Sequence, residues 1–240
     1  MTSKQILEKI KSKGYWRILF EPLGDSTIKP LSRCRDLVVN NSVELRGWDY
    51  PHIPKRKGED TALEPGDSFW QAWLDWTDYA HYEFWRFYQS GQFIHYLAIP
   101  QDWKEGVVYK NLWENDRSLE SGEFLGVLGT VYLFTEIFLF ASKLAAEGVY
   151  KDGLKITISL NNTENRKLFV DSHGRTPFFS EKKTAAEKIE YSEIYSNEDL
   201  IAKSKQFARD FILYFFERFD WQPNPEMIEG DQDKLLNRQI

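Results

Sequence analysis

The chain has 240 residues, a formal net charge of −6, and 42% apolar residues, of which the aromatic types alone make up 16% of the chain. This length suffices for one large domain or two small ones with a sizeable core. The acidic balance argues against a general nucleic-acid binder, for which a basic excess is typical. A single cysteine, Cys34, excludes an internal disulfide and fits a reducing compartment. Because the first residues lack the apolar segment of a signal peptide, we expect a cytoplasmic protein.

The first part of the chain alternates short helices and strands. Apolar periodicity predicts an amphipathic helix over residues 3–13 and a strand over 15–21. A second short helix over 31–39 and a second strand over 42–50 follow. Residues 51–68, rich in proline, glycine and charge, are predicted to form a long surface loop or a lid.

The aromatic residues are densest between positions 69 and 99. There a period of two predicts strands, with Trp70, Ala72, Leu74 and Trp76 on one face. Residues 83–89 and 92–98 flank Ser90-Gly91 and are typical of a β-hairpin. If the loop has two residues, Arg86 faces His95 across the hairpin. Both faces are largely apolar, so we expect this hairpin inside a sheet that is covered on both sides.

The longest apolar run, residues 122–147, predicts one helix that is apolar nearly all round, capped by Ser121 and ended by Gly148. Such a helix is buried in a large core or spans a membrane. Glu136 near its middle and the lack of a basic flanking cluster favour a buried helix and no membrane. We expect Glu136 on a narrow exposed seam; the alternative is a pair with a buried cation such as Arg17 or Arg86.

The last third of the chain predicts more strands and a final helix. Residues 154–160 alternate cleanly, and the loop 161–165 predicts a hairpin with 166–171. A last strand covers 188–195, and Ser196 caps a helix that continues to Trp221. We therefore expect one domain over residues 1–223 and a loosely held polar tail over 224–240.

These elements predict an α+β fold, because the strands come in runs instead of alternating strictly with helices. We expect a mainly antiparallel sheet of about six or seven strands. Two long helices, one central and buried and one C-terminal, should cover it, together with two short N-terminal helices.

Sequence motifs of phosphate loops, dinucleotide folds, serine hydrolases and zinc proteases are absent, and four histidines with one cysteine argue against structural zinc. The best candidate site joins two stretches of the chain around an Arg and a His on an apolar face. A buried cation is costly unless something anionic satisfies it. The candidate ligand-binding residues are Arg46, Trp48, Asp49, His52, Arg86, Gln92 and His95.

Other interpretations stay open. Glu44 or Asp49 could satisfy these cations internally, without any ligand. Carboxylates such as Glu44 and Glu190 could serve a metal-dependent hydrolase or nuclease. Cys34, between two arginines, could be a nucleophile, although a lone helical cysteine more often serves packing.

The leading hypothesis from the sequence is an intracellular binding or regulatory module. Its aromatic-lined recess, with arginine and histidine, would hold a partner protein or a small anionic ligand. A metal-dependent hydrolase or nuclease is the first alternative. Nucleic-acid binding by aromatic stacking, helped by the basic residues 55–57, is the second.

Overall fold

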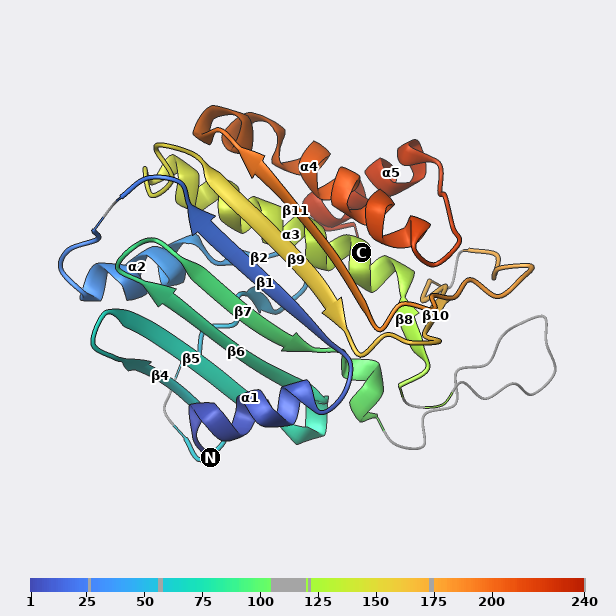
Figure 1. The fold of residues 1–240 in the computed structure, drawn as a ribbon, viewed down its shortest axis with the longest axis horizontal. Helices are drawn as coiled ribbons and strands as arrows, with labels where there is room; N and C mark the ends of the chain where they lie inside the picture. The colour runs from blue at the N-terminus through green and yellow to red at the C-terminus, as the bar shows by residue number, and fades with distance from the viewer. Residues whose placement is uncertain (26, 56–57, 105–119, 121, 173–174, 240) are drawn as a thin grey trace.

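The computed structural model describes residues 1–25, 27–55, 58–104, 120, 122–172 and 175–239 (Figure 1). Seven strands form one antiparallel sheet in the order β11-β9-β1-β7-β6-β5-β4. These strands are β1 (Tyr15–Pro22), β4 (Thr61–Pro65), β5 (Phe69–Trp76), β6 (His81–Tyr88), β7 (Phe93–Ala98), β9 (Leu154–Asn161) and β11 (Lys188–Tyr195). The helices are α1 (Ser3–Lys11), α2 (Ser32–Asn41), α3 (Val127–Ala146), α4 (Asn197–Glu217) and α5 (Pro225–Leu236). The α+β class with an antiparallel sheet is therefore confirmed.

Six short elements complete the described chain. Two of them are 3₁₀ turns, η1 (Thr77–Tyr79) and η2 (Pro100–Trp103). The other four segments form two small ladders, an antiparallel pair of β2 (Val43–Glu44) with β3 (Asp49–Tyr50) and a parallel pair of β8 (Phe124–Gly126) with β10 (Lys167–Phe169).

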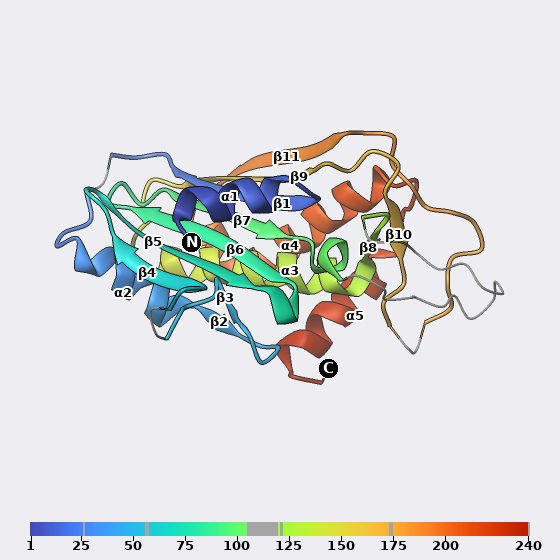
Figure 2. The same cartoon turned by 90° about the horizontal axis from the view of Figure 1, so that it is seen from below.

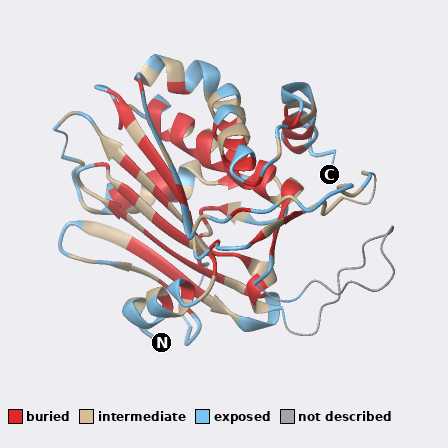
Figure 3. Ribbon diagram, turned by 45° about the vertical axis from the view of Figure 1, so that its right-hand side comes forward, coloured by how far each residue is buried: buried red, intermediate tan, exposed pale blue. Residues whose placement is uncertain are grey.

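The sheet has a different cover on each face (Figure 2). On one face lie α3 and α4, and the strands direct alternate residues such as Trp16, Ile18 and Phe20 of β1 toward them. On the other face α1 buries Ile6 and Ile10 over β5, β6 and β7. The buried residues accordingly concentrate between the sheet and the long helices (Figure 3).

Helix α3 is the centre of this core. By length and composition it could cross a membrane, but most of it is buried inside the protein. We conclude that α3 is the core helix of this fold, because a helix that is buried on most sides is apolar nearly all round. It begins at Val127, later than expected, because the preceding residues form β8. The expected cap, Ser121, lies outside the described residues; Asp171 instead accepts hydrogen bonds from the Leu128 and Gly129 amides at 2.6 and 2.9 Å.

The predicted hairpin of β6 and β7 exists, but its register differs by one residue. The turn has three residues, 89–91. The Tyr88 amide donates a hydrogen bond to the Gln92 carbonyl, and the Gly91 amide donates one to the Tyr88 carbonyl, each at 2.9 Å. Gly91 has φ +82°, a conformation that favours glycine. Arg86 therefore faces Ile94, while His95 faces Trp85. A slip of one residue places a side chain on the opposite face, so Arg86 and His95 do not share a face.

Three further expectations were wrong. Residues 42–50 form no continuous strand, because Gly47 at φ +80° turns the chain and β2 pairs back on β3. Strand β10 pairs with β8 and not with β9, since Arg166 turns inward to a buried ion pair with Asp102 at 2.7 Å. The loop 51–68 contains β4.

The C-terminal segment is not the loosely held polar tail that we expected. Residues 225–236 form α5, which buries Ile228 and Leu235 completely against the rest of the core. Gln232 Nε2 also donates to Thr135 Oγ1 of α3 at 3.2 Å. The sequence of this segment looks polar because only two apolar side chains in its three turns are fully buried.

Candidate functional site

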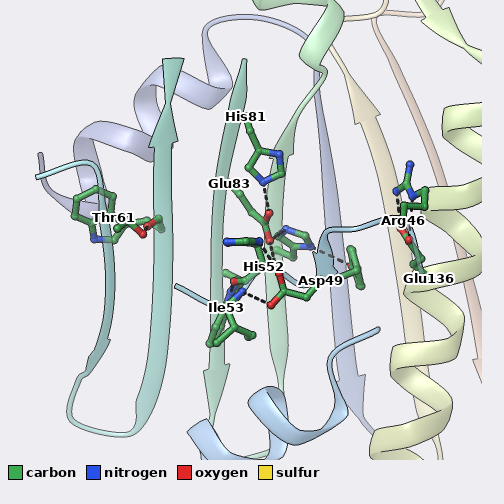
Figure 4. Close-up of polar contacts among 12 residues, drawn as sticks. Arg46, Asp49, His52, Ile53, Thr61, His81, Glu83 and Glu136 are labelled. Carbon is green, nitrogen blue, oxygen red and sulfur yellow. Dashed lines mark hydrogen bonds and ion pairs between the residues drawn. The ribbon is translucent and has the colours of Figure 1, made fainter. Parts of the chain in front are cut away.

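The buried carboxylate of Glu83 lies between the sheet and the segment around β3, close to His81 and to His52 (Figure 4). Glu83 is only 2% exposed. Its Oε2 lies 2.8 Å from His81 Nε2, and its Oε1 lies 3.0 Å from His95 Nε2. The His52 backbone amide donates to Oε1 at 2.9 Å. The buried charge of Glu83 is thus surrounded by donors, as a carboxylate without water requires.

The period of the strands produces this convergence. His81 and Glu83 are two positions apart on β6 and so share a face. His95 on β7 is opposite Trp85, the next residue of that face. His52 follows β3, which crosses this face of the sheet, and the Trp85 indole holds it by donating to the His52 carbonyl at 2.8 Å.

A second carboxylate extends the network. Asp49 Oδ1 lies 2.6 Å from His52 Nδ1, and Asp49 Oδ2 accepts the Ile53 amide at 3.0 Å. The other ring nitrogen of His95, Nδ1, lies 3.0 Å from the Tyr50 hydroxyl. Each carboxylate of this network therefore fixes both a histidine ring and a backbone amide.

The charges and hydrogen bonds of this network shift the pKa values of Glu83 and His52. Burial alone would raise the pKa of Glu83, but the charges of His95 and His81 and their hydrogen bonds hold it well below its usual range. Burial alone would lower the pKa of His52, but the hydrogen bond with Asp49 and the charges of Glu83 and Asp49 raise it. We therefore expect Glu83 to be ionised and His52 to be protonated more readily than a free histidine.

Outside this network, the buried carboxylate of Glu136 on α3 forms an ion pair with Arg46. Arg46 Nε and Nη2 donate to the two carboxylate oxygens at 2.9 and 2.5 Å. Glu136 is 1% exposed, so the prediction that it lies on a narrow exposed seam of the helix was wrong. The alternative of a paired cation holds, but the cation is Arg46 instead of Arg17 or Arg86. Burial raises the pKa of Glu136 despite this partner, and nearby Glu83 raises it further.

A cavity of about 480 Å³ lies beside the Glu83 network and the Arg46–Glu136 pair, and it is lined by His81 and Arg46. It lies between the ends of β6 and β7, the η2 turn and the first two turns of α3, and it is also lined by Arg46 and Trp48. Its basic lining residues are Arg46, His81 and Lys104, and no Asp or Glu is found among its described lining residues. In a chain of net charge −6, this wall is locally basic.

Aromatic rings form the other part of the wall. Trp48 stacks on His81 with ring centroids 5.3 Å apart and planes 18° apart. Its ring also lies 5.7 Å from Trp76 and from Tyr79. Trp48 nevertheless stays 40% exposed and Tyr79 64% exposed. Both of these aromatic residues line the cavity.

The structure unites some of the predicted site residues and separates others. Arg46 and Trp48 line the cavity, and Asp49, His52 and His95 lie in the network behind it. Arg86 points to the opposite face, where it donates to Gln71 Oε1 at 3.1 and 2.7 Å. Gln92 belongs to the β6–β7 turn.

Sequence reasoning missed four residues of the site, namely Tyr79, His81, Glu83 and Lys104. The period of two on β6 already places His81 and Glu83 on one face, so that pair could have been found. Lys104 follows η2 and carries no local signal.

The other chemical candidates receive less support from the geometry. Cys34 is completely buried, and burial raises the pKa of its thiol to about 11, which opposes thiolate formation. Glu190 pairs with Lys188 at 2.7 Å on β11, and Glu44 stays exposed on β2. In the described part of the chain no three His, Cys, Asp or Glu residues are grouped as metal ligands would be. Residues 56–57 of the basic stretch lie outside the described residues.

Comparison with protein-family models, with curated proteins and with solved structures found no match to this chain.

Proposed function

We propose that the protein is a binding module for a small anionic ligand, which occupies the cavity between the β6–β7 ends and α3. One observation carries this proposal: two buried carboxylates each orient a basic side chain toward the same cavity, whose described lining contains no acid. Glu136 holds Arg46, and Glu83 holds His81. Neither carboxylate lines the cavity itself.

Arg46 supplies the main anchor in this proposal. Its Nε and Nη2 serve Glu136, while Nη1 makes no hydrogen bond to the described residues. The guanidinium is thus fixed on one side and keeps donors for a carboxylate, sulfonate or phosphate on the other. A cation whose position is already fixed loses less conformational entropy when it binds.

The amide groups at the start of α3 are not the anchor. Asp171 already accepts the hydrogen bonds of Leu128 and Gly129 there. The anion is therefore recognised by side chains. Exposed Lys104, which has no ion-pair partner among the described residues, adds a positive charge at the η2 side. A cavity of this size suits a small molecule better than a protein segment, which would use a larger and flatter surface.

The test compares two probes of nearly the same shape, naphthalene-2-sulfonate and neutral naphthalene-2-sulfonamide, by isothermal titration calorimetry. We expect the sulfonate to bind at least tenfold more tightly. Equal affinities for the two probes would contradict the proposal.

Two variants locate the effect. The double substitution Arg46→Met with Glu136→Met leaves the net charge unchanged and avoids an unpaired buried carboxylate. It should weaken sulfonate binding more than tenfold. Lys104→Met should weaken it about three- to fivefold. Lys155→Met, on the outer side of β9, is the control and should have no effect.

A further inference from the structure

We infer that the anion bound in this cavity carries a planar aromatic ring, which stacks on Trp48. This inference rests on the proposed function and names its ligand class: aryl carboxylates, aryl sulfonates, or phosphates that bear a nucleobase or another flat ring.

The first step is the placement of exposed aromatic surface. Large apolar side chains that stay exposed in groups mark binding sites more often than chance exposure does. Trp48 and Tyr79 are both exposed, their ring centroids are 5.7 Å apart, and both line the cavity. Exposed aromatic side chains beside a basic wall are suited to a ligand that is flat at one end and anionic at the other.

The second step is how Trp48 is held. The β2–β3 turn presents it, with Gly47 at φ +80° just before it. His81 stacks beneath the indole, Trp76 and His52 contact it at centroid distances of 5.7 Å, and Glu83 fixes His81 in turn. The indole is thus a supported platform. Stacking on a fixed ring costs little conformational entropy.

The third step is the position of the charge relative to the ring. Arg46 and Trp48 are separated only by Gly47, and both side chains line the cavity. The aromatic and cationic contacts are therefore presented by one short turn. A ligand whose anionic group is attached to its ring directly or through a short linker can bind Arg46 with the anion and stack its ring on Trp48 at the same time.

The test compares naphthalene-2-sulfonate with decahydronaphthalene-2-sulfonate, which has the same anion and carbon skeleton but no flat ring. Isothermal titration calorimetry on the wild-type chain should show about a three- to tenfold preference for the aromatic anion. Trp48→Leu keeps an apolar side chain and should reduce this preference to within twofold.

Tyr79→Leu provides a second variant that does not depend on Trp48, since Tyr79 is 64% exposed and its replacement leaves the core intact. It should reduce the preference for the aromatic anion by about half or more. If the wild-type chain binds both anions within twofold of each other, the inference is overturned while the proposed anion site stands. If neither anion binds, both the inference and the proposed function are wrong.

Discussion

Glu83 shows at the scale of single residues how the site and the stability of the fold depend on each other. Its carboxylate is buried against the rings of His81 and His95 and the His52 amide, and it positions His81, which lines the cavity. Removing one partner from a buried ionic cluster leaves the others without compensation. The residue is therefore both structural and, through His81, a positioning residue for the ligand.

The substitution Glu83→Gln should lower the free energy of unfolding by about 3–5 kcal/mol, because it removes a buried charge around which two histidine rings and the His52 amide are arranged. Urea denaturation monitored by tryptophan fluorescence measures this. Glu190→Gln, on the exposed edge strand β11, is the matched control and should change the value by less than about 0.5 kcal/mol. A similar small change for both variants would show that the cluster contributes little.

The dependence of stability on pH follows from the same residues. The pKa of Glu83 in the folded state lies below its ordinary value of 4.5, so its contribution is present above about pH 4.5 and is lost as the pH falls. The pKa of His52 lies above its ordinary value of 6.5, so its contribution is complete below about pH 6.5 and is lost as the pH rises through the raised value. The two contributions therefore coincide between about pH 4.5 and 6.5.

Urea unfolding of the wild type, Glu83→Gln and His52→Gln across pH 2 to 8 separates these contributions. The difference between wild type and Glu83→Gln should shrink as the pH falls from about 4.5 toward 2, and the difference for His52→Gln should shrink toward pH 8. Differences that stay constant over the whole range would contradict the assignment.

Cys34 provides a simple test of the core. Because its thiol is completely buried and its pKa is raised to about 11, it should react with a chromogenic disulfide reagent at pH 7 only after unfolding. Absorbance with and without guanidinium chloride measures the reaction. Rapid labelling of the native chain would place Cys34 at the surface and reopen the nucleophile hypothesis.

At the scale of elements, α5 shows where polar composition misleads. Its buried side chains are few, but they pack on α3 and α4. Leu235 is completely buried and its neighbour Leu236 is 36% exposed, so the helix contains its own control. Leu235→Ala should lower the free energy of unfolding by about 2–5 kcal/mol. Leu236→Ala should lower it by less than about 1 kcal/mol, and equal effects would show that α5 does not dock as described.

Local periodicity was enough to predict most of these elements. The bounds of β11 are those expected, and those of β1, β9 and α1 are within two residues of the predicted ones. Such segments alternate or repeat over at least two turns, so their own sequence determines both their type and their inward face. The buried helix α3 could be predicted because no exposed helix is apolar on nearly every side.

The site was predictable only in part, because it depends on long-range geometry. The turn between β6 and β7 contains three residues instead of two, and this one residue moved Arg86 away from His95. The pair of Arg46 with Glu136 joins residues 90 positions apart, and no local pattern reveals it. Trp48, Asp49 and His52 were found because an unusual concentration of polar and aromatic residues is visible in the sequence itself.

At the scale of the whole molecule, charge is distributed unevenly between two cavities. The cavity of about 480 Å³ on the α3 side has a basic and aromatic wall. A second cavity of about 700 Å³ on the α1 side is lined by Trp73 and by several acids, Glu59, Asp60, Glu64 and Asp75. A small anion should therefore distinguish the two sides of the sheet, although the molecule as a whole is acidic.

The most direct measurement is a titration of the ¹⁵N-labelled protein with naphthalene-2-sulfonate, followed through the indole N–H signals of its nine tryptophans. Trp48→Leu and Trp73→Phe assign the two signals that matter. We predict that the Trp48 signal shifts in a saturable manner while the Trp73 signal does not move. A shift at Trp73 with none at Trp48, or no shift at either, would contradict a binding site for anions in the basic cavity.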